Sequence, residues 1–395
     1  MTIHRMQNVR IRNALLAVLI VAIGIFFRIL VAQRGHNIDV DSYLIVANIF
    51  SNGGNVYQET SRYNYGPIWF HILYFIDLCH IDGIAWLSNL RLKITLFLTA
   101  VDLGIFLFLW RHYSLKIGAI FLLNPISIII TGYHSQFDNL AILLGFFSVY
   151  FYTRSDSRSA KIGSLVLLGL SLSTKHLLFL FPIWLAFKQK QKITALIVIL
   201  IPYAIFITGF LPYLPEGAQG IIKNVLLYKS FNNAPFWAIF SPNVIYTFVP
   251  RTLLMILALL IVGFLVRRRT VLECLHIYLI ALVVFSSALA NQYLAIPIAS
   301  ISVFWNWGYA AYSAIGLLYL AVAQDGLHLE FLREIFNWRG GYGYYILIFL
   351  LTAGFFMTFF GRNFDKKFRK TLRTIRNKVW WTCNGSILYL RGLTQ

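Results

Sequence analysis

Long runs of apolar residues divide this chain, and they constrain its fold more than any other feature. A helix that crosses a bilayer needs about 20 mostly apolar residues, and its backbone groups must be hydrogen-bonded within the segment. The sequence contains roughly a dozen such runs, some of them short or broken. We expect helices near residues 13–33, 92–110, 117–131, 138–153, 161–174, 176–187, 193–211, 251–266, 271–289, 292–306, 308–324 and 343–361.

The composition leads to the same class of protein. Hydrophobic residues make up 59% of the 395 residues and charged residues only 12%, whereas a soluble domain has roughly 25% charged residues. A chain of this composition cannot hide its apolar surface in one water-soluble core. The sequence therefore predicts an all-α polytopic membrane protein with roughly 11–13 transmembrane helices. We expect residues 1–395 to form a single integral membrane domain.

The net charge of +20 would suggest nucleic-acid binding in a soluble protein, but here the placement of the charges is more informative. Lys and Arg gather in alternate connections between the apolar runs, and such connections face the cytoplasm. Both termini are therefore predicted to be cytoplasmic, and the basic tail 362–395 is expected to contact membrane lipids and no nucleic acid. The other basic residues on this side are Arg5, Arg10, Arg12, Arg111, Lys116, Arg154, Arg158, Lys161, Lys188, Lys190, Lys192 and Arg267 to Arg269.

Two less apolar segments are predicted to face outward. Residues 34–91 form the first external loop, and residues 212–250 form a second large one. Both mix Gly, Pro and aromatic residues with apolar ones, which is typical of amphipathic helices that lie in the membrane interface. Residues 325–342 form a smaller patch of this kind. Because no segment is long enough for a soluble nucleotide-sugar-binding domain, we expect any chemistry at the external membrane face.

Two carboxylates, Asp39 and Asp41, lie where the chain is predicted to leave the bilayer. A carboxylate at a low-dielectric boundary has a raised pKa, which suits a proton acceptor. Alternatively, Asp41 is the N-cap of the helix-like sequence SYLIVANIF. A cap needs one carboxylate rather than two, and Arg28 in the first span lies near enough to pair with one of them. We therefore interpret the pair as functional.

The sequence GGNVYQETSRYNYGPIWFHIL follows the acidic pair and contains Tyr63 and Tyr65. Aromatic faces with polar tips bind sugar rings, but an aromatic belt at the membrane interface explains these residues about as well. Arg62 beside them is a candidate for holding a phosphate bidentately. A salt bridge at the rim of the protein is the alternative for this arginine.

A cluster of polar residues lies in the sequence YHSQFDN, where one span is predicted to end outward and another to begin. His134, Gln136, Asp138 and Asn139 fall within six residues. Polar side chains at such a position are candidates for binding hydroxyls or phosphate. A cap of the next helix is the alternative role for Asp138 or Asn139, whereas His134 and Gln136 have no such role.

Lys175 and His176 interrupt the apolar sequence STKHLLFLFP and are predicted to face outward. A broken helix that carries a lysine suits an anion site, with snorkelling of Lys175 as the alternative. Arg251, at the outward end of a later span, is a second candidate for a phosphate partner. Gln292 and Tyr293 lie at another outward hairpin, where Tyr293 alone is typical of an aromatic belt.

These motifs resemble the membrane glycosyltransferases of the GT-C class, which take sugar from a polyprenyl phosphate. YHSQFDNLAILLGFFSVYF and KHLLFLFP are similar to the hairpin and the Lys-His and Pro pattern of the dolichyl-phosphate-glucose-dependent glucosyltransferases of asparagine-linked glycosylation, although His-Ser-Gln-Phe-Asp-Asn replaces a tighter motif. DVDSYLIVANIFSNGGNVYQETSRYNYGPIW is similar to the first external loop of GPI-anchor and bacterial mannosyltransferases, and NQYLAIPI to a Gln-Tyr pattern of the GPI enzyme. The resemblance covers residues 39–70 and 124–187, and more weakly 215–237 and 291–298.

The resemblance implies an inverting transferase that moves a hexose, mannose or glucose, from a polyprenyl-phosphate donor to a hydroxyl of a glycan or glycolipid acceptor. An Asp of the first external loop would deprotonate that hydroxyl. Alignment on the Gly-Tyr segment favours Asp39, and alignment on the start of the helix favours Asp41, which we take as the base. Lys175, Arg62 or Arg251 would neutralise the leaving phosphate, so we expect no metal and no other cofactor.

A transporter or flippase for a lipid-linked sugar is the main alternative. It would show charged residues near the middle of several spans and a repeat between its halves, and Asp102 is almost the only such residue. A membrane O-acyltransferase is a third class, but its histidine is expected deep within a helix bundle. His134 and His176 are predicted to lie near an edge instead.

Overall fold

Every regular element in the described part of the chain is a helix. The computed structural model describes residues 2–79, 89–155, 157–228, 234–240, 249–323, 325–336 and 342–360, with side chains described from Ile11 onward. The predicted basic tail 362–395, together with parts of the three predicted external segments, lies outside these residues.

The elements follow one another along the chain with short connections. Several of them are single turns that interrupt a longer helix, as the broken apolar runs predict. In order they are α1(Thr2–Gln33), α2(Ile38–Ser51), α3(Val56–Glu59), α4(Ile68–Leu78), α5(Leu90–His112), α6(Leu115–Leu122), α7(Pro125–Gly132), α8(Asp138–Arg154), α9(Arg158–Thr174), η2(His176–Leu178), α10(Phe181–Ala186), α11(Lys192–Thr208), η3(Leu211–Tyr213), α12(Leu214–Gly220), η4(Ile221–Leu226), α13(Pro235–Phe240), α15(Arg251–Val266), α16(Val271–Val284), η5(Asn291–Ala295), α17(Ile298–Val303), α18(Trp307–Val322), α19(Glu330–Arg333) and α20(Tyr342–Phe360).

Four of the described helices are long and apolar enough to cross a membrane. They are Ile11–Gln33 within α1, the whole of α5, the helix Lys192–Leu226 and α20. The pair α6 and α7 is bent by 50° and gives a fifth if it is one broken span. The bend occurs because Pro125 opens α7 and the side chain of Asn124 caps it. The all-helical prediction is thus confirmed for the described residues, and these apolar helices are compatible with a membrane protein.

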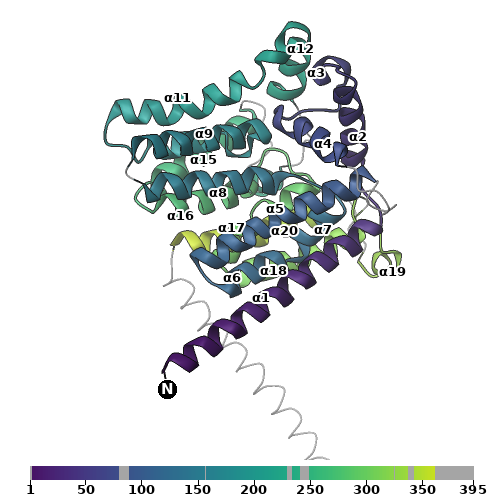
Figure 1. Ribbon diagram of the computed structural model, residues 1–395, viewed down its shortest axis with the longest axis vertical. Coiled ribbons are helices and arrows are strands. Elements are labelled where there is room, and N and C mark those ends of the chain that lie inside the picture. Colours follow the sequence, from purple (N-terminus) through teal and green to yellow (C-terminus); the bar gives the residue numbers. More distant parts are fainter. Residues whose placement is uncertain are drawn as a thin grey trace, which may run out of the picture.

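Helix α8 lies at the centre of the bundle. It packs against α9, α5 and α16, and α9 packs in turn against α11 (Figure 1). Small polar side chains join α8 to α9: the Ser171 hydroxyl donates to the Ala141 carbonyl, and the Ser148 hydroxyl to the Ser164 carbonyl, both at 2.7 Å. Such contacts are typical of helices that approach closely within a membrane.

Basic connections that the sequence places on one side of the membrane lie together at one end of the bundle. The ammonium group of Lys188, after α10, donates to the carbonyls of Arg267 at 2.7 Å and of Arg269. Arg269 in turn donates to the Phe359 carbonyl near the end of α20 at 3.1 Å. The ends of α10, α15 and α20 are therefore neighbours.

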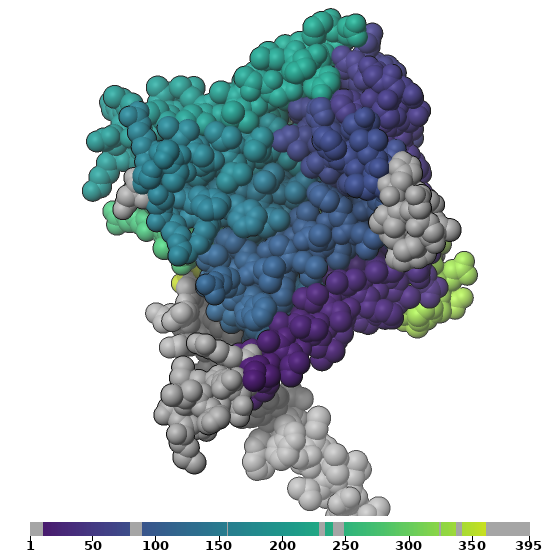
Figure 2. All heavy atoms as spheres, viewed as in Figure 1, coloured from purple at the N-terminus to yellow at the C-terminus, as the bar shows by residue number. Residues whose placement is uncertain are grey.

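The opposite end carries a cap that is made from the two predicted external segments. The Asn55 amide donates to the Tyr213 carbonyl at 3.1 Å, and α12 packs against α3. Figure 2 shows the first segment and the teal-green residues of α12 as one continuous surface. One detail differs from the prediction of separate interfacial helices, because α11 continues through η3 and α12 as the single apolar helix Lys192–Leu226.

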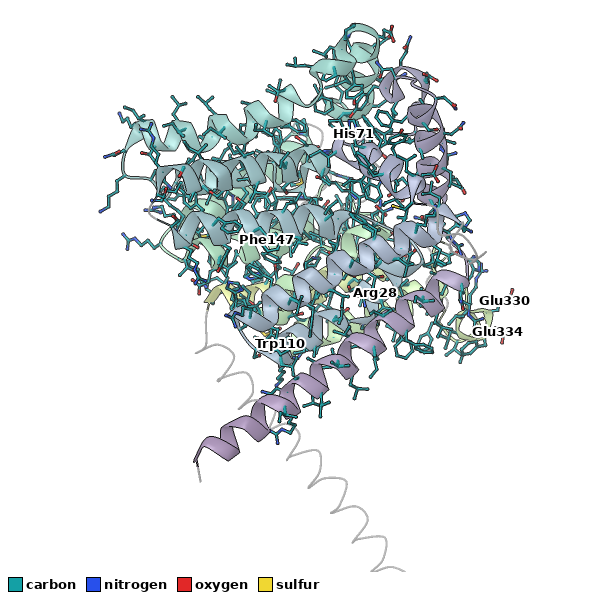
Figure 3. The ribbon with its side chains drawn as sticks, viewed as in Figure 1. Arg28, His71, Trp110, Phe147, Glu330 and Glu334 are labelled. Atoms are coloured by element: carbon teal, nitrogen blue, oxygen red, sulfur yellow. The ribbon has the colours of Figure 1, made fainter. Side chains whose placement is uncertain are left out.

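The predicted pairing of Arg28 with the first external loop is wrong. Arg28 is a residue of α1 (Figure 3) and is fully buried. It forms a salt bridge with the equally buried Asp102 of α5, with 2.9 Å between Nη2 and Oδ2. Thr131 and Asn139 donate to the same carboxylate at 2.7 and 2.6 Å. Arg28 and Asp102 both have their partners in the interior, so Arg28 is not available to Asp39 or Asp41.

The arginine also holds the bend between α6 and α7. Its Nη1 donates to the carbonyls of Gly24 at 3.1 Å and Leu122 at 2.8 Å, and its Nη2 donates to the Ser127 hydroxyl at 2.9 Å. Together with the hydrogen bond from Nε to Asp102 at 2.9 Å, these bonds involve all three nitrogens of the guanidinium group. The Arg28 side chain thereby joins α1 to α5, α6 and α7.

Gly66 is a point where the first external segment touches the helix bundle. A Cβ atom added there would lie 1.9 Å from the backbone oxygen of Ser173 in α9. We expect Gly66→Ala to lower the stability by about 1–3 kcal/mol, because a backbone atom cannot move aside as a side chain can. Gly163→Ala in the same helix α9 has open space around it and should leave stability equal or raise it by up to about 1 kcal/mol. Thermal unfolding of both variants in detergent measures the difference, and equal melting temperatures would contradict the close contact.

Candidate functional site

Helix α2 begins four residues earlier than the sequence suggests, and this places the two carboxylates on different sides. Asn37 is the N-cap, since its side-chain oxygen accepts from the Asp39 amide at 3.3 Å. Asp39 and Asp41 both lie in the first turn of α2. The alternative role of Asp41 as N-cap is therefore wrong, and the two side chains, separated by about 200° around the helix axis, point to different surroundings.

Asp39 points toward the polar hairpin between α7 and α8. Its Oδ2 accepts from the Gln136 side-chain amide at 2.6 Å and from the Asn37 amide at 3.0 Å. The side chain is partly buried, and burial raises the pKa of this carboxyl, although the hydrogen bond from Asn37 and the charge of Lys175 oppose the rise. No described residue donates to Oδ1, so the described hydrogen bonds hold only one of the two oxygens of the carboxylate.

Asp41 lies on the outer rim instead. Its side chain is 49% exposed and accepts from Nε2 of His36 at 2.9 Å. The other ring nitrogen of His36 lies 3.1 Å from Nη1 of Arg91. These three side chains tie the start of α2 to the start of α5 at the surface, and they do not reach the polar hairpin.

The hairpin itself adopts an uncommon backbone conformation. Ser135 is buried and has a φ of 51°, which few residues other than glycine adopt. Its hydroxyl lies 3.1 Å from that of Thr95 in α5. The turn at Ser135 separates His134 and Gln136, and both side chains meet residues of the first external segment.

Neither Asp138 nor Asn139 caps α8, which has Phe137 at its N-cap position without a side-chain cap. Asp138 instead accepts from the Lys175 ammonium at 2.7 Å, and Asn139 donates to Asp102 at 2.6 Å. The capping alternative for these residues is thus wrong. Their tertiary contacts anchor the hairpin to α9 and to the buried pair of Arg28 and Asp102.

Lys175 occupies the break between α9 and η2, where the sequence predicts a broken helix. Its ammonium group donates to Asp138 and, at 3.3 Å, to Gln136 Oε1, and it lies 4.9 Å from the ring centres of Tyr65 and Phe137. The side chain is only 5% exposed, so it does not snorkel to the surface. Because Asp138 balances its charge within contact distance, Lys175 offers little net positive charge to a phosphate.

His134 is buried and neutral. Its Nδ1 lies 3.0 Å from the Asn37 side-chain nitrogen, and burial lowers its pKa to about 4. Nε2 has no hydrogen-bond partner in the described part of the chain. A buried ring nitrogen without a partner is uncommon in proteins, and it marks this side chain as a candidate contact for a ligand.

The aromatic residues of the first external segment divide into two groups. Tyr63 and Trp69 are fully buried; the Tyr63 hydroxyl donates to the Gly66 carbonyl at 2.6 Å, and Trp69 stacks on Phe137 at 4.1 Å. These two residues belong to the packed core rather than to a belt. Tyr65 is half-buried beside Lys175, and burial, with smaller effects of Asp39 and Tyr293 among other groups, raises its pKa well above the usual range.

A cavity of about 900 Å³ is lined by His176, the residue that follows Lys175. Most of its lining is apolar and comes from α15, α16 and the helix Lys192–Leu226, which suits a lipid chain. No carboxylate lies among the described residues that line it, and Nδ1 of His176 has no described partner there. Its polar lining residues include His176, Tyr228, Arg251, Ser286, Ser287 and Tyr293.

Two other predicted residues are not among those that line the cavity. Arg62 is exposed, and its guanidinium group donates to the Ile38 carbonyl at 3.3 Å. Gln292 lies in η5, half-buried, and is not among the residues that line the cavity. Tyr293, its neighbour, does line the cavity.

Two contributors to the site were missed in the sequence. Asn37 contacts both Asp39 and His134, and its signal was the preference for Asn immediately before a helix. Phe137 lies under both Lys175 and Trp69, and no sequence pattern distinguishes it from other core phenylalanines. Comparisons of the chain with known protein families, with characterised proteins and with solved structures found no match.

Proposed function

We propose that this protein is an inverting glycosyltransferase of the GT-C class with roughly 11–13 transmembrane helices. It would move a hexose from a polyprenyl-phosphate donor to a hydroxyl of a glycan or glycolipid acceptor. In this proposal both termini are cytoplasmic, and the cap formed by α2, α3, α4 and α12 lies on the external face. The basic connections at the other end of the bundle support that orientation.

The observation that carries the proposal is the hydrogen bond of Asp39 to the polar hairpin, near one end of the lipid-sized cavity. Lys175 links the two, since its ammonium group donates to Gln136, which donates to Asp39, and the next residue in the chain, His176, lines the cavity. Asp39 has one oxygen fixed by two amide donors and one oxygen without a described donor. This arrangement suits a general base better than exposed Asp41 does, so we now assign the base to Asp39.

The reaction follows from these positions. Asp39 Oδ1 takes the proton of the acceptor hydroxyl, and the acceptor oxygen forms a bond to the anomeric carbon. The bond from that carbon to the phosphate oxygen breaks on the opposite face, which inverts the configuration and releases polyprenyl phosphate. Negative charge that develops on the phosphate is stabilised by Arg251 and by His176 at the cavity, which is why we expect no metal cofactor.

Lys175 has a different role in this scheme from the one its sequence suggested. Its contacts to Gln136 and Asp138 hold the amide that in turn donates to Asp39. We propose that Lys175 orients the base through Gln136, and that Arg251 rather than Lys175 meets the donor phosphate. Tyr293 and Tyr65 would contact the sugar between them.

The direct test supplies purified protein in liposomes with a panel of labelled polyprenyl-phosphate mannose and glucose donors and with lipid-linked glycan acceptors. Labelled product of inverted anomeric configuration, together with free polyprenyl phosphate, is the expected result. Movement of the intact lipid-linked sugar across the bilayer without any transfer would favour the flippase alternative. Asp102 gives that alternative no support, since its carboxylate is fully occupied by Arg28, Thr131 and Asn139.

We expect Arg251→Gln to raise the KM for the donor about tenfold, because a hydrogen bond to a charged group contributes about 1.5–3 kcal/mol. The KM for the acceptor should stay within about twofold, since the arginine lies at the cavity and not at the hairpin. Initial rates measured at varied donor and acceptor concentrations give both constants.

Arg62→Gln is the matched comparison for this arginine. The Arg62 side chain is exposed and donates to a backbone carbonyl, so we expect both KM values to remain near those of the wild type. A rise of the donor KM in Arg62→Gln, with none in Arg251→Gln, would move the phosphate site to the first external loop.

A further inference from the structure

We propose that Asn37 is a positioning residue that orients Asp39 and fixes His134 as a hydrogen-bond donor to the acceptor substrate; this inference rests on the proposed glycosyl transfer. The residue has three contacts from one side-chain amide. Its oxygen accepts from the Asp39 backbone, and its nitrogen lies 3.0 Å from both Asp39 Oδ2 and His134 Nδ1. No other described side chain forms hydrogen bonds with both of these residues.

The orientation of the Asn37 amide follows from its surroundings. The N-cap contact requires an oxygen opposite the Asp39 backbone N–H. The carboxylate of Asp39 requires an N–H donor opposite Oδ2. If the amide were turned around, its oxygen would face Oδ2 of Asp39 at 3.0 Å, and its N–H groups would face the backbone N–H of Asp39. Two independent contacts therefore select the same orientation.

The tautomer of His134 follows in turn. An amide nitrogen has two hydrogens and no acceptor capacity, so one hydrogen goes to Asp39 and the other goes to His134. Nδ1 of His134 must accept that hydrogen, and in a neutral imidazole the ring proton is then on Nε2. His134 is thus a donor through Nε2 and cannot compete with Asp39 as a base at that atom.

This donor is the end of one hydrogen-bonded chain. His134, Asn37, Asp39, Gln136 and Lys175 are joined in that order by contacts of 3.0, 3.0, 2.6 and 3.3 Å. The Nε2–H of His134 is buried and has no described partner. In this proposal the Nε2–H donates to an oxygen of the acceptor sugar, whose hydroxyl Asp39 binds in the reaction.

The first test reads the tautomer directly and does not depend on activity. The full-length protein is labelled with ring-¹⁵N histidine, and the His134 signals are assigned by their loss in His134→Gln. At neutral pH we expect Nε2 to be protonated and Nδ1 to be unprotonated. In Asn37→Asp, a carboxylate oxygen replaces the amide N–H, so the proton should move to Nδ1. A wild-type His134 that is protonated at Nδ1 would overturn the proposal.

The second test measures transfer in variants that keep the helix cap. Asn37→Ser retains a good N-cap residue but cannot supply the two amide hydrogens, so kcat should fall about 100-fold while the melting temperature changes by no more than about 2 °C. Asn89→Ser is the matched control, since Asn89 caps α5 in the same way and forms no hydrogen bond with the site among the described residues. Equal rates for Asn37→Ser and wild type would overturn the positioning role.

Substitution of His134 separates its two nitrogens. The amide nitrogen of Gln reaches the position of Nε2, whereas that of Asn reaches only the position of Nδ1. We expect kcat/KM for the acceptor to be about tenfold lower in His134→Asn than in His134→Gln. The reverse order would overturn the donor assignment. If the wild type transfers no sugar at all, the proposed function fails, while the ¹⁵N spectra still decide whether Asn37 fixes the tautomer.

Discussion

Asp39→Asn should lower kcat about 10³-fold, in line with the loss of a general base. The substitution keeps the size and the hydrogen-bonding shape of the side chain but removes its ability to take a proton. Since Asp39 is only partly buried and forms no salt bridge within the described part of the chain, the melting temperature should remain close to that of the wild type. Initial rates with a labelled polyprenyl-phosphate sugar and far-ultraviolet circular dichroism give the two quantities.

Asp41→Asn is the control for this prediction. Asp41 lies in the same turn of α2, is 49% exposed and contacts His36 at the rim. We expect its transfer rate to stay within about twofold of wild type, as for most exposed substitutions. Loss of transfer in Asp41→Asn alone would return the base to Asp41, as the alignment on the helix start suggests.

The pH dependence of the wild-type rate provides a second measure of the same assignment. A base must be deprotonated to act, and burial raises the pKa of Asp39. The rate should therefore be lost as the pH falls through this raised pKa, at a higher pH than an exposed aspartate would give.

Arg28→Met should destabilise the protein by about 3–5 kcal/mol, and Asp102→Leu should have a similar effect. Each single substitution leaves the partner charge buried in the interior without compensation. The loss of Arg28 also leaves the Leu122 carbonyl at the bend of α6 and α7 without its donor. Unfolding in detergent, followed by heat or by denaturant, measures the change.

The double variant Arg28→Met/Asp102→Leu decides whether the two effects share one cause. We expect it to be less destabilised than the sum of the single variants by about 2 kcal/mol or more, because no uncompensated charge remains. Arg62→Met, at the exposed surface, is the control and should change stability by less than about 0.5 kcal/mol. Strict additivity of the two buried substitutions would contradict a shared ion pair.

The helices were predictable because their signal is local. Each apolar run gives helix in the described residues, and the break at Lys175 follows from a sequence where a lysine and a histidine interrupt an apolar stretch. The bend at Pro125 follows from proline and a capping asparagine. The long helix Lys192–Leu226 was harder to predict, because Pro212, Pro215 and Gly217 suggest a loop at a place where the chain remains helical.

The grouping of the site residues was also predictable in part. Asp39, His134, Gln136 and Lys175 were all expected on one side of the membrane, because connections between spans alternate. They do lie together. The sequence did not show whether Asp39 or Asp41 joins them, because this depends on the residue at which α2 begins. Within a helix, two side chains that are two positions apart point about 200° away from each other around the axis.

The sequence by itself determined that this chain is helical and apolar and has polar residues at the ends of its helices. These features depend on the length of an apolar run, its hydropathy and its breaks, which are all properties of neighbouring residues. Only the tertiary structure decided the partners of the charges. Arg28 pairs with Asp102 and Lys175 with Asp138, over separations of 74 and 37 residues. A buried charge takes the nearest opposite charge in space, and that distance depends on how the helices pack rather than on any pattern along the chain.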